Sequence, residues 1–157
     1  MRIADAEQSS IVSALGHFQA TTPGWRRDIM RSMRRYRLSQ NRQDITDQIL
    51  DLALAFEIAV SDESGNGPAS WKVSVRTAQF LGGSVEARLK ARETVNELYK
   101  LRNKATHGSS LKSASVNTLL SECAQLYSSL AAGLLSHKDM PDWRRIEMEP
   151  PPSGHAE

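Results

Sequence analysis

The sequence has little of what marks membrane and secreted proteins. Its 157 residues contain one cysteine, Cys123, so no disulfide can form within the chain. A lone thiol fits a reducing compartment. No apolar run approaches the roughly 20 residues that a membrane-spanning helix needs. The first residues include Asp5 and Glu7 and lack the apolar stretch of a signal peptide. These absences predict a cytoplasmic protein without a membrane partner.

Metal and cofactor chemistry has equally little support in the sequence. Cysteine and histidine do not cluster at zinc-ligand spacings, and no glycine-rich phosphate loop is present. Asp44, Asp47 and Asp51 fall on one polar side of an expected helix, where their separation favours solvation over a shared ion. The net charge of only +2 argues against general polyelectrolyte behaviour. We therefore expect no bound metal and no cofactor.

Apolar residues recur at spacings of three and four, which predicts helices, and no segment has a convincing strand period. The expected main helices cover residues 23–37, 42–61, 71–81, 85–107 and 113–136, with a loop at 38–41. Thr22 before Pro23 and Ser84 before Val85 are typical helix starts. Cys123 falls on the apolar stripe of the last helix, so we expect an inert buried thiol. The fold class predicted is all-α, an up-and-down bundle of four to five antiparallel helices.

The chain divides into three expected parts. A short N-terminal helical extension covers residues 1–22, the helical bundle covers residues 23–138, and a mobile proline-rich tail covers residues 139–157. Trp143 is the exception in the tail, because a large aromatic side chain favours docking on the bundle.

Arginine is concentrated early in the chain, with six between Arg26 and Arg37. On a helix, Trp25, Ile29, Met33 and Tyr36 share the apolar face. The arginines that fall largely on the other side are Arg27, Arg31, Arg34 and Arg35. Two interpretations fit this pattern. It is a solvated helix face, or it is a surface that contacts RNA phosphates.

Glu57 lies in the middle of an apolar arc of its expected helix. A carboxylate that is half or fully buried needs a hydrogen-bonded or charged partner. One interpretation is a structural pair with an arginine or a tyrosine hydroxyl. The other is that Glu57 orients Arg102 or His107.

Arg102 occupies a position where an apolar residue would be expected. It shares a helical stripe with Ala91, Val95, Leu98 and Ala105. Its guanidinium cannot lose its charge, so it needs an acceptor, a partner chain or a hydrated groove.

His107 falls at the end of the same expected helix, where Gly108 suits the residue that closes it. A histidine at a helix C-terminus is also favoured by the helix dipole alone, which is the simpler explanation for His107.

The pattern Leu-Tyr-x-x-Arg-Asn-x-x-x-His-Gly, from Leu98 to Gly108, resembles the signature of HEPN domains of the ApeA-like branch. The stretch over residues 47–57 is similar to the second helix of those domains. The resemblance covers about residues 26–137 and is specific only near 99–108. It implies a HEPN-like bundle that forms a homodimer with metal-independent endoribonuclease activity, in some cases as a toxin or defence protein. Arg102 and His107 would then be catalytic with Asn103 alongside, and Glu57 and Tyr99 would support them.

The implied reaction uses the ribose 2′-hydroxyl as nucleophile, with His107 as general base and Arg102 stabilising the charge that develops on the phosphate. Two other interpretations stay open. One is a non-catalytic HEPN-type module that binds a nucleotide, RNA, or a protein such as an antitoxin or another regulator. The other is a helical interaction domain in which Arg102 forms a structural ion pair.

Overall fold

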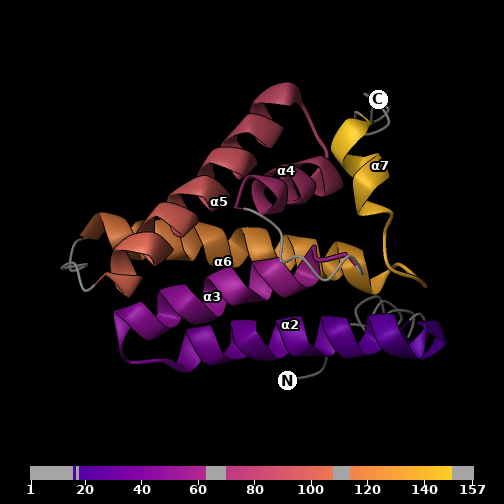
Figure 1. Ribbon diagram of the computed structural model, residues 1–157, viewed down its shortest axis with the longest axis horizontal. Coiled ribbons are helices and arrows are strands. Elements are labelled where there is room, and N and C mark those ends of the chain that lie inside the picture. Colours follow the sequence, from indigo (N-terminus) through magenta and orange to yellow (C-terminus); the bar gives the residue numbers. More distant parts are fainter. Residues whose placement is uncertain (1–15, 17, 63–69, 108–113, 150–157) are drawn as a thin grey trace, which may run out of the picture.

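The computed structural model describes residues 16, 18–62, 70–107 and 114–149. All the regular secondary structure in these residues is helical, which confirms the predicted all-α bundle. The helices are α2 (Pro23–Asn41), α3 (Ile45–Ala59), α4 (Ser70–Leu81), α5 (Val85–Thr106), α6 (Ala114–Leu135) and α7 (Trp143–Met148) (Figure 1). Residues 1–15, 108–113 and 150–157 lie outside the description, so the expectations for Gly108, most of the N-terminal extension and the proline run are not addressed.

Two helix pairs and α6 make up the bundle. Helices α2 and α3 lie side by side and run in opposite directions, joined by a short turn, while α4 and α5 form a second pair (Figure 1). The core lies where α3, α5 and α6 meet, and Phe56, Leu98 and Leu130 are completely buried there. Cys123 is buried in the same core, and this burial raises the pKa of its thiol to about 12. A thiol that stays protonated at neutral pH is unreactive, as expected.

Side-chain hydrogen bonds start α3 and α5, whereas Thr22, predicted to start α2, makes no capping bond, and α2 begins with Pro23. Ser84 Oγ accepts a hydrogen bond from the Ala87 N–H at 3.2 Å, which starts α5 as predicted. Asp44 caps α3 by accepting from the Thr46 and Asp47 N–H groups. Residues 38–41, predicted to be a loop, instead form the last turn of α2. That prediction was wrong because Ser39 is buried against the bundle, and the helix ends only where Arg42 becomes extended.

Asp51 departs from the expectation that the acidic side of α3 is solvated. It is only 5% exposed, and its two carboxylate oxygens accept from Arg35 Nη1 and Arg42 Nε, each at 2.9 Å. A buried carboxylate with two arginine partners has its charge balanced by them and does not need a cation. In the described ranges, no group of histidine, cysteine or acidic residues could hold a metal ion.

The packed structure continues past residue 138, where the tail was expected to begin. Trp143 is 1% exposed, so the residue singled out for docking does dock, and the short helix α7 that it begins lies against α4. Arg76 of α4 is also 1% exposed and holds this end of the chain. Its Nε donates to Glu147 at 2.6 Å, and its Nη groups donate to Asp62 and to the Val60 carbonyl oxygen.

Gly133 in α6 allows the Phe80 ring to approach closely. A Cβ atom at Gly133 would lie 2.8 Å from Phe80 Cε1, and Phe80 is held by ring contacts with His137 and Trp143. We expect Gly133→Ala to lower the free energy of unfolding by about 1–3 kcal/mol despite the better helix propensity of alanine. Gly24→Ala is the control, since nothing lies within 4 Å of its Cβ, and it should be neutral or stabilising by about 0.4–1 kcal/mol. Urea unfolding measures both, and equal stability of the two variants would contradict the close contact.

Candidate functional site

The last turns of α5 hold Arg102 between the core and the surface. Its neighbours on the helical stripe, Ala91, Val95, Leu98 and Ala105, are buried, whereas the Arg102 side chain is 39% exposed. Arg102 Nη2 lies 3.5 Å from Glu57 Oε1. The guanidinium carbon lies 5.7 Å from the centroid of the Tyr99 ring, within range of a cation–π contact. The acidic side chain of Glu57 and the aromatic ring of Tyr99 therefore restrict the orientation of the Arg102 guanidinium.

Glu57 is the residue that links this helix end to α3. Its side chain is 19% exposed, which agrees with the expected half-burial in the apolar arc. Both kinds of partner considered from the sequence lie beside it: Arg102 forms an ion pair with it, and, after burial and the Glu57 charge, a hydrogen bond between the Tyr99 hydroxyl and the Glu57 carboxylate contributes to the raised pKa of Tyr99. No ion pair or hydrogen bond joins Glu57 to His107 in the described part of the chain.

Tyr99 lies beneath the guanidinium and is buried between α5 and α3. Its hydroxyl donates to the Ala53 carbonyl oxygen at 3.5 Å. Burial, and next the negative charge of Glu57, raise the pKa of Tyr99 well above its ordinary value. The phenol is therefore neutral at any physiological pH and cannot serve as a base. It acts as a fixed platform under Arg102.

Asn103 and His107 are both exposed at the same helix end. The His107 backbone N–H donates to the Lys104 carbonyl oxygen at 3.2 Å, and His107 is the first residue after α5. His107 follows Arg102 by five residues, which at about 100° per residue places the two about 140° apart around the helix. No hydrogen bond between their side chains is present among the residues described. One chain therefore directs Arg102 and His107 to different sides of the helix end.

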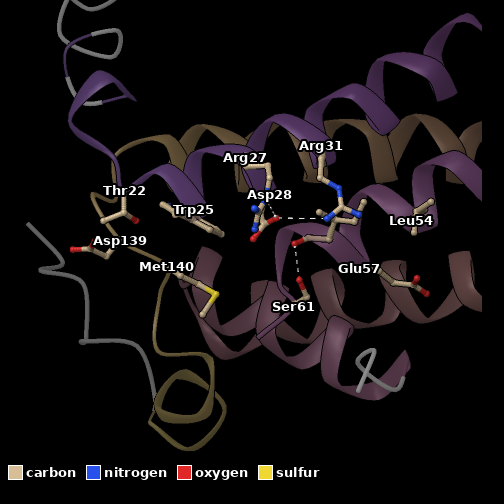
Figure 2. Close-up of a pocket in the computed structure, with 12 residues that line it drawn as sticks. Thr22, Trp25, Arg27, Asp28, Arg31, Leu54, Glu57, Ser61, Asp139 and Met140 are labelled. Atoms are coloured by element: carbon tan, nitrogen blue, oxygen red, sulfur yellow. Dashed lines mark hydrogen bonds and ion pairs between the residues drawn. The ribbon is translucent and has the colours of Figure 1, made fainter. Parts of the chain in front are cut away.

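A hollow of about 920 Å³ lies between the start of α2, the end of α3 and residues 139–140, with Glu57 at one end (Figure 2). Two of the predicted RNA-binding arginines, Arg27 and Arg31, line it, and each has a nitrogen 3.6 Å from Asp28 Oδ1. The carboxylates that line it are those of Asp28, Glu57 and Asp139. Two arginines against three carboxylates do not favour a phosphate, so this hollow is a poor anion site.

The other predicted RNA-binding arginines take two different positions. Arg34 is exposed, and its guanidinium has no ion-pair partner in the described ranges. Arg35 turns toward α3 and donates to Asp51. Arg37, which the sequence analysis did not select, takes the outer position instead, with Arg27, Arg31 and Arg34, along a groove between α2 and α6.

Sequence reasoning also missed Asp51 and Arg76, the two most buried charged residues of the part of the chain that the structure describes. A signal for Asp51 was present, because it lies between Leu50 and Leu52 in an apolar run. For Arg76 the sequence offers no comparable signal, because polar residues make up half of its helix.

Comparison with known proteins found no relative of this chain. No protein-family model, no curated protein and no solved structure matches the chain. None of the helices in the described ranges is both long enough and apolar enough to cross a membrane.

Proposed function

We propose that this chain is a HEPN-like, metal-independent endoribonuclease that acts as a homodimer, with Arg102 and His107 as catalytic residues. One observation carries the proposal. Arg102 is partly exposed although Glu57 and Tyr99 hold it, and the exposed Asn103 and His107 lie on the same helix end. An arginine with restricted motion and an open face is suited to stabilise charge on a phosphate.

The divergence of Arg102 and His107 within one chain is the reason for proposing a dimer. Two copies that pair about a two-fold axis near the end of α5 bring the Arg102 of one chain toward the His107 of the other. The predicted homodimer thus supplies a composite site that a single helix end lacks. Light scattering at micromolar concentration should give twice the chain mass, and a purely monomeric mass would count against this arrangement.

The proposed reaction is an internal transfer on RNA. His107 takes the proton of the ribose 2′-hydroxyl as that oxygen attacks phosphorus, and the P–O5′ bond breaks. A protonated His107 of the partner subunit returns a proton to the leaving 5′-oxygen, so the products are a 2′,3′-cyclic phosphate and a 5′-hydroxyl. Arg102 stabilises the charge on the non-bridging oxygens, and Asn103 hydrogen-bonds the phosphate. DNA lacks the 2′-hydroxyl and is not a substrate.

The test is incubation of the purified protein with single-stranded and structured RNA in excess EDTA. We expect cleavage to persist without divalent ions, to leave 2′,3′-cyclic phosphate ends and to fail on DNA of the same sequence. RNA that stays intact between about pH 6 and 9, where imidazole can act as a base, would rule out the nuclease.

A second candidate function is a non-catalytic module that binds RNA, a nucleotide or a regulatory protein such as an antitoxin. The Glu57–Arg102 ion pair favours it, because a guanidinium already paired with a carboxylate has less charge to offer a phosphate. Tight RNA binding without cleavage would select this candidate.

The contribution of Glu57 to stability is testable apart from activity. We expect Glu57→Leu to lower the free energy of unfolding less than Glu57→Ala does, because leucine refills the space in the apolar arc and Arg102 can turn to solvent. The difference should be about 1 kcal/mol or more. Urea unfolding followed by circular dichroism measures it. Two variants that unfold at the urea concentration of the parent would show that neither the ion pair nor the packing at Glu57 contributes.

A further inference from the structure

A second concave surface lies away from the end of α5. It is a groove of about 890 Å³ between α2 and α6, here called the α2–α6 groove. Its α6 side carries Ser128, Ala131 and Ala132, which are small enough to leave the groove open, with Leu135 at one end. From α2, Met30 and Met33 enter it, and Met30 is 52% exposed.

The floor of the groove favours an apolar ligand. A methionine that is half exposed beside alanine and leucine side chains loses contact with water only when another apolar surface covers it. Methionine is also flexible enough to fit partners of different shape.

The edge of the groove is strongly basic. Arg27, Arg31, Arg34 and Arg37 line it at spacings of four, three and three along α2, and no acidic residue is among its described lining residues. Among the described residues, Asp28 is the one carboxylate within ion-pair distance of these arginines, and it is shared by Arg27 and Arg31 at 3.6 Å each. The guanidinium groups of Arg34 and Arg37 have no ion-pair partner within the described ranges. The edge therefore attracts a ligand with several negative charges.

The aromatic side chains of the groove argue for a protein ligand over RNA. Tyr36 stacks on Tyr127 with ring centroids 4.5 Å apart and an interplanar angle of 21°. The Tyr36 hydroxyl also lies 3.1 Å from Ser128 Oγ. Tyr127 is 1% exposed and covers one face of the Tyr36 ring, so the described lining of the groove lacks the successive open ring faces on which single-stranded RNA sites stack their bases. An apolar floor with a basic edge instead matches a helix with one apolar and one acidic side.

We propose that the α2–α6 groove binds an acidic amphipathic helix of a partner protein. Arg27 and Arg37 are ten residues apart, so the basic edge extends over about 15 Å. A ligand helix of about three turns matches that length, with apolar residues at i, i+3, i+4 and i+7 toward Met30 and Ala132 and with glutamates toward the arginines. This inference does not depend on the nuclease proposal, because none of its residues belongs to the end of α5.

The test uses the full chain and a fluorescein-labelled synthetic helix of 14 residues with leucines at those positions and glutamates beside them. Fluorescence anisotropy should show saturable binding. Ala132→Glu, which places bulk and negative charge in the groove at an exposed position, should weaken binding at least tenfold, as should Arg34→Glu. Ser129→Glu is the matched control, because it changes an exposed residue of the same helix outside the groove lining and should bind like the parent.

Four results would overturn the proposal. A scrambled peptide of the same composition that binds equally well would reduce the effect to charge alone. Single-stranded RNA that binds the parent but not Ala132→Glu would assign the groove to RNA. A dimer of the parent that Ala132→Glu dissociates would assign it to a second copy of this chain. No saturation by the designed helix at 100 µM, about the weak limit of specific recognition, would also count as failure.

Discussion

RNA cleavage should fall at least 100-fold in both Arg102→Ala and His107→Ala if the end of α5 is the active site. Removal of a general base costs about 10²–10⁴ in rate, and removal of a charge-stabilising donor costs about 10²–10³. His107 is exposed and its side chain has no hydrogen bond with the described residues, so His107→Ala should leave the free energy of unfolding unchanged within about 0.5 kcal/mol. Initial rates on a fluorogenic RNA in EDTA, with circular dichroism of each variant, give the measurement.

Lys104→Ala is the matched control for these two variants. Lys104 is exposed on the same turn of α5 and carries the same charge as Arg102. The Lys104→Ala variant should lose less than tenfold in cleavage rate if catalysis depends on the position of the Arg102 guanidinium and not on the general basicity of this helix end. Arg102→Lys separates charge from geometry, because lysine retains the charge without the planar fork. Normal cleavage by His107→Ala would refute the assignment of the base. Failure of Arg102→Ala to fold, with Glu57 left unpaired, would favour the structural ion pair.

Arg76→Ala should cause the largest loss of stability of any single substitution considered for this protein, about 3–5 kcal/mol. The side chain is 1% exposed and makes three hydrogen bonds of 2.6–2.8 Å, to Glu147, Val60 and Asp62. Its removal takes the arginine partner from the carboxylates of Asp62 and Glu147, whose side chains are each 16% exposed. It also leaves a cavity between α4 and α7. Urea unfolding followed by tryptophan fluorescence reports both the global loss and any separate release of Trp143.

Two further variants make the Arg76 result specific. Arg76→Lys retains the charge but cannot reproduce three bonds from a planar group, so its stability should lie between those of the parent and Arg76→Ala. Arg144→Ala changes an exposed arginine of α7 and should stay within about 0.5 kcal/mol of the parent. A loss below 1 kcal/mol in Arg76→Ala would mean that α7 is held by the apolar contacts of Trp143 alone.

Helix content and several helix ends could be predicted because local chemistry decides them. The three-and-four spacing of apolar residues along α5 and α6 leaves one buried stripe on each, and Ser84 starts α5 through a bond to its own first turn. The half-burial of Glu57 followed from the same periodicity. The resemblance in the Leu98–Gly108 pattern, and not periodicity, directed attention to His107 and Asn103.

The wrong or missing predictions concern contacts between helices. Asp51 was expected to be solvated because its own helix places it beside other acids, yet Arg35 and Arg42 cover it from α2 and from the turn after it. The ion pair with Asp51 also directs the Arg35 guanidinium toward α3, and Arg37 instead of Arg35 lines the basic edge of the groove.

By itself, the sequence determined that this protein is built of helices, which side of α2, α5 and α6 is buried, and that Glu57 lies at the boundary of the apolar core. Only the tertiary structure decided which charges meet. The pairs Glu57–Arg102 and Arg76–Glu147 join residues 45 and 71 positions apart in the chain. The physical reason is that helix periodicity is set by bonds within four residues, whereas an ion pair depends on where two helices cross. Crossing positions follow from the packing of the whole core, which no single helix contains.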